Sequence, residues 1–252
     1  MQWLGSIVFT VFMAVYTIPF ALVYCIVCPF LSFRGRFWMA GMMTYPTFFV
    51  LRVLCGLTYT VEGRENLPPG NHVIFMKHSS TWETYAIMIL FEPLVWVMKR
   101  EIYWIPFVGW GCMLARCIAI DRKAGTAAVN QVLTQGKDRM ERFGAWVLVF
   151  PEGTRMAPGE TRRYGSSGTL LAAQQKCKIV PVAHNAGYFW PRRGVLKKPG
   201  VIRVVIGPPI DPVGRDARAV NEEVQTWIES HVHAAQPASG PAGEPGGTPV
   251  VK

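Results

Sequence analysis

Two side chains with the chemistry of a proton-transfer pair lie five positions apart in the stretch MKHSSTWET, residues 76–84. An apolar run that is typical of a strand leads into His78, and a run that is typical of a helix begins just before Glu83. In a parallel sheet, such a strand delivers His78 to the carboxyl edge, where open α/β folds bind ligands. A carboxylate bonded to one imidazole nitrogen fixes the tautomer and makes the other nitrogen a better base. The spacing therefore indicates a His–Glu pair able to take a proton from a hydroxyl.

The same residues have a purely structural interpretation. Ser80 and Glu83 fit the S-x-x-E pattern of a capping box, in which the glutamate accepts a backbone N–H at the start of a helix. His78 would then be an ordinary polar residue at a strand end. The two interpretations are compatible, because one carboxylate has two oxygens.

A second cluster of polar residues, FPEGTR at 150–155, follows the buried run that begins at residue 145. Gly153 permits close approach of the backbone, Thr154 offers a hydroxyl, and Arg155 offers a fork of donors suited to phosphate. The alternative is a surface turn with a Glu–Arg pair, because charged turns are common.

Four blocks in the chain together resemble the 1-acylglycerol-3-phosphate acyltransferase (lysophosphatidic acid acyltransferase) family. They are an H-x4-D-like block at His78–Glu83, a run ending in Asp121–Arg122, the hexapeptide FPEGTR at 150–155, and the apolar run 179–182 around a proline. They occur in the family's order, and the hexapeptide is unchanged. Glu83 departs from the pattern, because the family usually has aspartate there. The resemblance implies an α/β fold.

The resemblance also implies an activity and roles for the residues that match. A fatty acyl group would pass from acyl-CoA or acyl-acyl carrier protein to the 2-hydroxyl of lysophosphatidate, forming phosphatidate for phospholipid biosynthesis. His78 would be the general base and Glu83 would orient it. Glu152 would hold an arginine or a backbone amide in place. Arg122 and Arg155 would bind the acceptor phosphate, and Glu152, Gly153 and Thr154 would support this site. We expect neither a metal nor a cofactor.

Other functions remain open at this level. The acceptor could be another lysolipid, such as a lyso-ornithine lipid. A histidine-based lipid hydrolase would release free fatty acid, although the G-x-S-x-G elbow of serine hydrolases is absent from the sequence. A membrane scaffold with a relic fold would have no need for the full set of polar motifs.

The N-terminal third of the chain predicts contact with a membrane. Residues 1–33 carry no charge and could cross the roughly 30 Å hydrocarbon core, although we expect Pro19 and Pro29 to break or kink this helix. A second uncharged run, 37–51, is short for a span. The alternatives are one span or a helical hairpin in one leaflet, and the three flanking arginines, Arg34, Arg36 and Arg52, favour the cytoplasmic side in both. A cleaved signal peptide is disfavoured, because the run is too long and no basic residue precedes it.

The composition favours a location at a membrane surface. Of the 252 residues, 50% are hydrophobic and only 17% are charged, which is below the roughly 25% of typical soluble proteins. The net charge of +10 favours anionic partners, but the positive charges occur in pairs without a long basic arm, so we expect a bilayer and no nucleic acid. The stretch 102–111 holds Trp104 and Trp110, which would line an acyl groove, meet the interface or pack in the core. The six cysteines are interpreted as reduced and mostly buried.

After residue 55, short strand-like runs alternate with helical stretches, which predicts an α/β fold with a mostly parallel sheet flanked by helices. We expect three regions: a hydrophobic anchoring segment at 1–55, an acyltransferase domain at 56–233, and a disordered tail rich in proline and glycine at 234–252. If the source is bacterial, the protein would lie at the inner membrane with its catalytic domain facing the cytoplasm.

Overall fold

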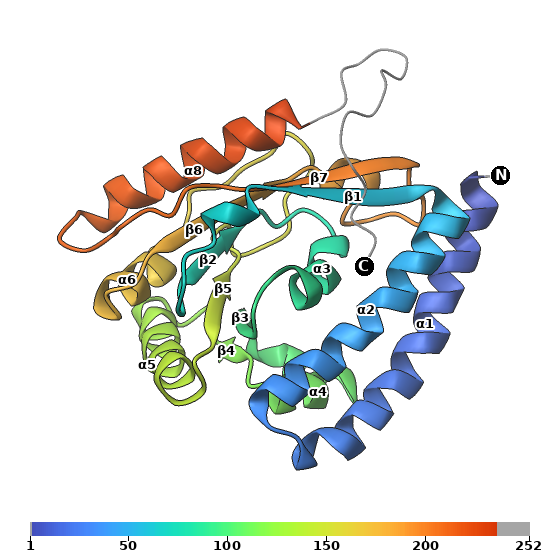
Figure 1. The fold of residues 1–252 in the computed structure, drawn as a ribbon, viewed down its shortest axis with the longest axis horizontal. Coiled ribbons are helices and arrows are strands. Elements are labelled where there is room, and N and C mark those ends of the chain that lie inside the picture. The colour runs from blue at the N-terminus through green and yellow to red at the C-terminus, as the bar shows by residue number, and fades with distance from the viewer. Residues whose placement is uncertain (1, 236–252) are drawn as a thin grey trace.

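A computed structural model describes residues 2–235, so most of the predicted tail lies outside the described residues (Figure 1). The α/β prediction is confirmed, with one seven-stranded sheet in the order β1-β7-β6-β2-β5-β3-β4. The strands are β1 (Leu57–Glu62), β2 (Val73–Met76), β3 (Leu94–Lys99), β4 (Ile118–Ile120), β5 (Trp146–Val149), β6 (Ile179–His184) and β7 (Gly200–Ile206).

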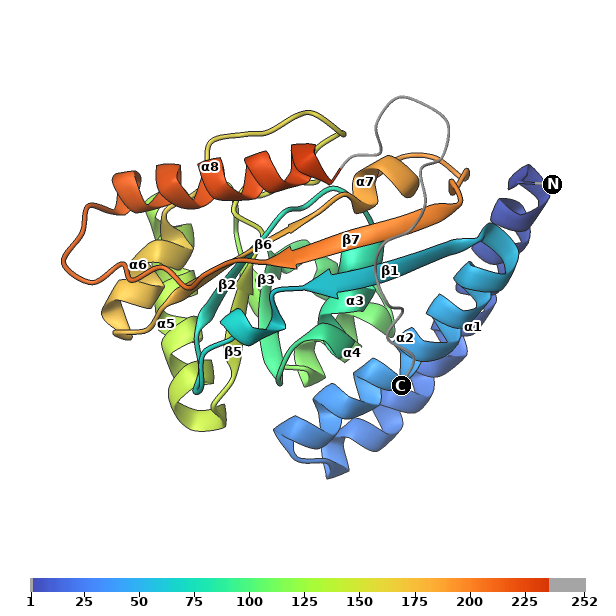
Figure 2. The ribbon, with the colours of Figure 1, turned by 45° about the horizontal axis from the view of Figure 1, so that its top comes forward.

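Helices cover both faces of this sheet (Figure 2). They are α1 (Gln2–Val27), α2 (Phe33–Cys55), α3 (Trp82–Leu90), α4 (Val108–Leu114), α5 (Thr126–Phe143), α6 (Ser167–Gln174), α7 (Ala186–Phe189) and α8 (Ala217–Ala234), with short 3-10 helices at Cys28–Phe30, Arg64–Asn66 and Arg100–Trp104. One apolar core joins the sheet to α1, α2, α3 and α7, and a second joins the opposite face to α5, α6 and α8.

The central strands show why the sheet is buried on both sides. Every residue of β2 is buried, with Ile74 and Met76 in one core and Val73 and Phe75 in the other. Such continuous apolar strands are typical of parallel sheets covered by helices. Strand β2 pairs in parallel with β5 and with β6, so the segments that follow β2 and β5 emerge side by side at the carboxyl edge. Only β6 and β7 pair antiparallel among the described strands.

The N-terminal runs form two helices that lie against each other (Figure 1). We expected Pro19 and Pro29 to break or kink the first helix: Pro19 does not break it, because α1 continues through this residue, whereas α1 ends before Pro29, which lies in the 3-10 helix Cys28–Phe30. A proline removes one backbone hydrogen bond from a helix, and the turns on both sides of Pro19 hold α1 together. Helix α2 is longer than its uncharged run and includes Arg34 and Arg52.

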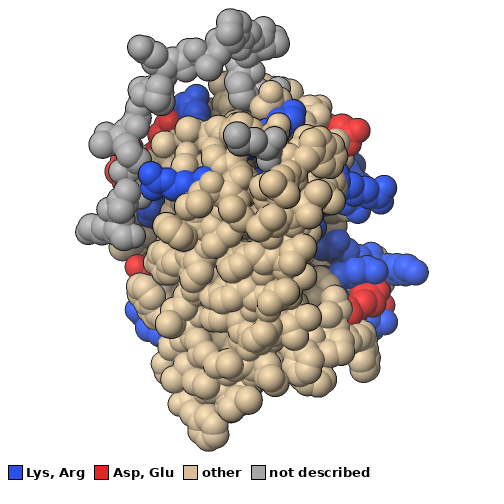
Figure 3. Space-filling model, turned by 90° about the vertical axis from the view of Figure 1, so that its right-hand side faces the viewer, with Lys and Arg blue, Asp and Glu red and all other residues tan. Residues whose placement is uncertain are grey.

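The two N-terminal helices turn a broad uncharged surface outward, with charged residues at its margins (Figure 3). The exposed apolar side chains of α1 include Trp3, Val15 and Ile26, and those of α2 include Trp38 and Phe49. A surface of this size is unusual for a soluble protein and marks an interaction site. Both helices are long and apolar enough to cross a membrane by length and composition.

The aromatic stretch beside α4 extends this apolar surface. Trp104 is 82% exposed and Trp110 is 46% exposed, so neither belongs to the core. Helix α4 packs against α1, which places the two apolar surfaces next to each other.

Candidate active site

His78 and Glu83 meet as their spacing predicts. The Nδ1 atom of His78 lies 3.0 Å from Oε1 of Glu83, whose side chain is fully buried. A carboxylate accepts, so Nδ1 carries the proton and Nε2 keeps its lone pair. The imidazole stacks on Phe150, with 4.0 Å between ring centroids, and its side chain remains 12% exposed. The ring is thus fixed in orientation and tautomer, with a basic nitrogen available to a substrate.

Glu83 performs the structural role and the chemical role with one oxygen. Its Oε1 accepts hydrogen bonds from the backbone N–H groups of Ser79 at 2.9 Å and Ser80 at 2.8 Å, besides the contact with His78. The capping interpretation is therefore half correct: Glu83 accepts the expected N–H, but the Ser80 hydroxyl accepts from Trp82. The Oε2 atom of Glu83 is buried without a hydrogen-bond partner in the described part of the chain.

Glu83 remains ionised although its side chain is buried. Burial opposes ionisation, but the hydrogen bonds from His78 and from the Ser80 backbone outweigh it and hold the pKa of Glu83 below its ordinary value. An ionised carboxylate beside Nδ1 stabilises the imidazolium that forms when Nε2 takes a proton.

Glu152 points toward the backbone of His78. Its Oε2 accepts from the His78 N–H at 2.9 Å, and its Oε1 lies 2.6 Å from Nζ of Lys77. Of the two partners expected for Glu152, an arginine or a backbone amide, the structure has the amide. The side chain is buried, so its direct contacts are to the polypeptide.

The rest of the FPEGTR segment lies at the carboxyl edge of β5, next to His78. Gly153 has φ of +70°, a left-handed conformation that favours glycine, and a Cβ there would meet nothing within 4 Å. The need for glycine is thus conformational, and the space beside it is open. The Nε atom of Arg155 is buried without a hydrogen-bond partner among residues 2–235. Thr154 is partly buried between these two residues.

Arg122 joins this group from the far end of the sheet. It follows β4, three strands away from β2, yet its guanidinium donates to the Gly153 carbonyl. Burial lowers the pKa of Arg122, but the ordinary value of 12.5 is so high that the group stays cationic at neutral pH. Arg192 approaches from another side and donates to the Arg155 carbonyl at 3.1 Å. The structure therefore gathers cations around residues 153–155.

Three neighbours of His78 received no role in the sequence analysis. Lys77 is buried beside Glu152, and Phe150 stacks on the imidazole. His184, at the end of β6, is buried with Nε2 2.8 Å from the Lys77 carbonyl, while its Nδ1 accepts from the Ala186 N–H. Burial lowers the pKa of His184, which agrees with this neutral tautomer. In the sequence, the only indication of a role for His184 is its position at the end of an apolar strand.

Comparison with known proteins places this geometry in a family. The chain is 40% identical, over 215 residues, to a 1-acyl-sn-glycerol-3-phosphate acyltransferase of Pseudomonas aeruginosa, covering 84% of this chain and 83% of that protein. The chain belongs to the 1-acyl-sn-glycerol-3-phosphate acyltransferase family. The family model named Acyltransferase matches residues 58–185, which include every predicted site residue.

More distant members of the 1-acyl-sn-glycerol-3-phosphate acyltransferase family agree. A relative of that name from Saccharomyces cerevisiae is 28% identical over 203 residues, which cover 75% of this chain and 66% of that protein. The crystal structure of the 1-acyl-sn-glycerophosphate (LPA) acyltransferase PlsC from Thermotoga maritima superposes with a TM-score of 0.74 at 20% identity. It covers 92% of this chain and 95% of that chain, so the fold is shared almost throughout, the two N-terminal helices included.

Proposed function

We propose that the protein is a lysophosphatidic acid acyltransferase, which transfers a fatty acyl group to the 2-hydroxyl of 1-acylglycerol 3-phosphate and forms phosphatidate. Family membership supports the activity. The His78–Glu83 pair beside the cationic FPEGTR segment supports the assignment of the catalytic and phosphate-binding residues. The donor is acyl-CoA or acyl-acyl carrier protein.

The chemical step is direct transfer. Nε2 of His78 takes the proton from the acceptor hydroxyl as its oxygen attacks the thioester carbonyl. The C–S bond then breaks, the ester forms, and the imidazolium returns the proton to the departing thiolate. Glu83 stabilises the transient imidazolium through Nδ1. A general base placed in this way typically contributes about 10²–10⁴-fold to the rate.

The acceptor phosphate binds at residues 153–155 in this proposal. Arg155 has a buried Nε–H without a partner in the described structure, and Arg122 uses one of its five donors on the Gly153 carbonyl. A phosphate there would satisfy the free donors of both guanidinium groups. Gly153 leaves room for the anion, and the Thr154 hydroxyl offers a further donor. Glu152 contributes indirectly, through the backbone of His78.

The two N-terminal apolar helices suggest association with a membrane, where a lysolipid acceptor resides. We place them as a hairpin in one leaflet. Near its N-terminus, α1 is held by Ser6, whose hydroxyl accepts from the Lys197 N–H; near its C-terminus, the Cys25 thiol contacts the Phe107 carbonyl. Contacts with the folded domain near both ends of α1 support a hairpin in one leaflet over a transmembrane span. The catalytic domain would face the cytoplasm, at the inner membrane of a bacterium.

Product analysis of the purified protein in detergent tests the activity. With labelled acyl-CoA or acyl-acyl carrier protein, we expect phosphatidate to form only when lysophosphatidate is present. A parallel panel with lyso-ornithine lipid and lysophosphatidylcholine should give much less product, because these acceptors lack the terminal phosphate. Preference for lyso-ornithine lipid would assign the other acceptor class, and release of free fatty acid regardless of acceptor would indicate a hydrolase.

A further inference from the structure

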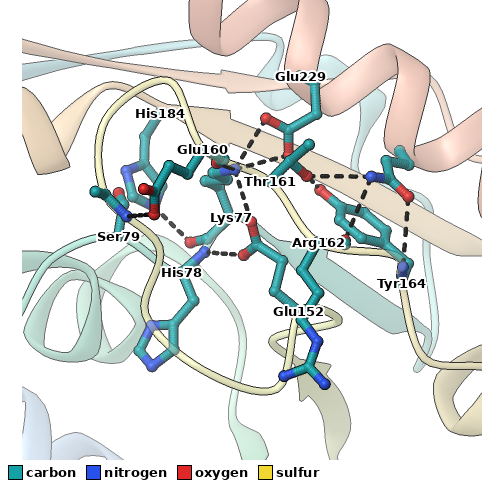
Figure 4. A network of polar contacts seen from close by, with 12 residues as sticks. Lys77, His78, Ser79, Glu152, Glu160, Thr161, Arg162, Tyr164, His184 and Glu229 are labelled. Atoms are coloured by element: carbon teal, nitrogen blue, oxygen red, sulfur yellow. Dashed lines mark hydrogen bonds and ion pairs between the residues drawn. The ribbon is translucent and has the colours of Figure 1, made fainter.

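A buried lysine next to His78 connects the site to the C-terminal helix (Figure 4). Lys77 is 2% exposed, and its ammonium lies 2.6 Å from Oε1 of Glu152. It also donates to both carboxylate oxygens of Glu229, at 2.8 and 2.9 Å, and to the Glu160 carbonyl at 2.8 Å. Glu229 belongs to α8, which lies beyond the residues that the family model matches. One ammonium thus joins a carboxylate at the site to a carboxylate on a distant helix.

The Lys77 contact decides the state of Glu152. Burial raises the pKa of Glu152 to about 7 even with the ammonium beside it. Without that ammonium, the pKa of Glu152 would rise further, which favours the neutral carboxyl and weakens its hydrogen bond to the His78 N–H. The hydrogen bond from the His78 N–H to Glu152 therefore depends on the position of the Lys77 ammonium.

Glu229 also holds the segment that contacts the other backbone group of His78. The segment 156–164 follows Arg155 directly, and the Met156 N–H donates to the His78 carbonyl at 2.7 Å. The hydroxyls of Thr161 and Tyr164 each donate to Oε1 of Glu229 at 3.0 Å. The segment has no helix or strand of its own, and Gln225 of α8 also forms hydrogen bonds with Thr161, Arg162 and Tyr164. Its position against His78 is thus fixed from α8.

We propose that Glu229 is a positioning residue for the acyl transfer, which sets the position of His78 through Lys77 and through the segment 156–164. This inference rests on the proposed function, because it assigns His78 as the reacting base. The side chain of Glu229 contacts Lys77, Thr161 and Tyr164, and it contacts neither the imidazole of His78 nor residues 153–155. It acts on the N–H of His78 by way of Lys77 and Glu152, and on the carbonyl by way of the segment.

The alternative is that Glu229 only anchors α8 to the domain. Three variants distinguish this structural role from a role in positioning His78. Glu229→Ala removes one acceptor of Lys77 and the acceptor of the Thr161 and Tyr164 hydroxyls, whereas Glu229→Gln keeps an acceptor oxygen of the same reach but sets its NH₂ group beside the Lys77 ammonium. Glu222→Ala is the matched control, since Glu222 lies on the same helix, is exposed and pairs only with Arg218 in the described structure.

Steady-state kinetics with lysophosphatidate should show a split between kcat and KM. Because a displacement of about 1 Å at a reacting group can cost about 10²-fold, we expect Glu229→Ala to lower kcat by roughly 10–100-fold. KM for lysophosphatidate should stay within about threefold, because Glu229 acts on the position of His78 and the phosphate-binding residues are unchanged. Glu229→Gln should recover part of kcat through its remaining acceptor oxygen, and Glu222→Ala should match the wild type.

A double-mutant cycle tests whether Glu229 acts through Lys77. If it does, Lys77→Met combined with Glu229→Ala should lose less kcat than the product of the two single losses, and the loss beyond Lys77→Met alone should report the route through the segment. Fully multiplying losses would show that nothing passes through Lys77 and would overturn the proposal, and so would a folded Glu229→Ala protein with wild-type kcat. If Glu229→Ala fails to fold, Glu229→Asp replaces it: the shorter side chain keeps the charge but should lower kcat, and an unchanged kcat would overturn the proposal.

The wild-type measurement keeps this test separate from that of the proposed function. Failure of the wild type to form phosphatidate counts against the function alone. The ratio of variant to wild-type kcat is then taken with whichever acceptor the wild type uses, and it reports on Glu229 in every case.

Discussion

Replacement of Glu83 by glutamine should have a mild effect for a residue that contacts the reacting histidine. Three N–H donors, from His78, Ser79 and Ser80, converge on the single oxygen Oε1. In Glu83→Gln, these donors require the amide oxygen at the Oε1 position, because an NH₂ group there would face three donors. The amide nitrogen then takes the place of Oε2, and His78 keeps its tautomer.

The magnitude follows from the lost charge alone. A hydrogen bond to a charged group contributes about 1.5–3 kcal/mol, and a neutral one about 0.5–1.5 kcal/mol. The difference of about 1.5 kcal/mol corresponds to a roughly tenfold loss of kcat. In Glu83→Ala, both charge and hydrogen bond disappear, so the loss should approach the about 10²–10⁴-fold contribution of a general base. The alanine variant also leaves the buried N–H groups of Ser79 and Ser80 without their acceptor and should melt at a lower temperature.

The assay is phosphatidate formation at saturating lysophosphatidate and acyl donor, well below the melting temperature of every variant. Circular dichroism of the same preparations checks that each variant is folded. A Glu83→Gln loss as large as that of Glu83→Ala would refute the argument from the three converging donors. Wild-type kcat in a folded Glu83→Ala protein would show that Glu83 only caps its helix.

Three further outcomes are expected. Burial raises the pKa of Glu152 from 4.5 to about 7, so the folded state retains a proton that the unfolded state has lost, and stability should fall as pH rises through this window. Glu152→Gln should remove this decline, worth up to about 3 kcal/mol, in denaturant titrations at pH 4.5 and 7.5; an unchanged slope would contradict the assignment. Arg155→Ala should raise KM for lysophosphatidate about 10–100-fold, because a charge-assisted hydrogen bond is lost, and leave KM for the acyl donor unchanged in the same kinetics; equal effects on both would argue against a phosphate contact. Trp104, 82% exposed, should contribute to membrane binding but not to folding, so Trp104→Ser should weaken sedimentation with anionic vesicles about tenfold at an unchanged melting temperature; equal binding would place the membrane elsewhere.

The sequence was sufficient for the local part of the site. The spacing of His78 and Glu83 predicts their contact, because a strand end and the first turn of the following helix fix the geometry within a few residues. The unbroken apolar strands likewise predict a sheet covered on both faces. In both cases, the pattern that allows the prediction lies within a few consecutive residues.

Contacts between distant segments were not predictable in this way. Glu229 lies 152 positions from Lys77, and one exposed-looking glutamate on an amphipathic helix resembles any other. The partner of Glu152 was left open for the same reason, since the choice between an arginine and the His78 amide depends on how β2 and β5 pair. A break at Pro19 was expected from the residue type alone, but the turns on both sides of it hold α1 together despite one missing hydrogen bond.

The most direct test of the account compares the wild type with His78→Ala in acyl transfer to lysophosphatidate. We predict that the wild type forms phosphatidate and that kcat falls by at least about 10²-fold in a folded His78→Ala protein. Equal phosphatidate formation by the two proteins would contradict the assignment of His78 as the general base and, with it, the mechanism built on the His78–Glu83 pair.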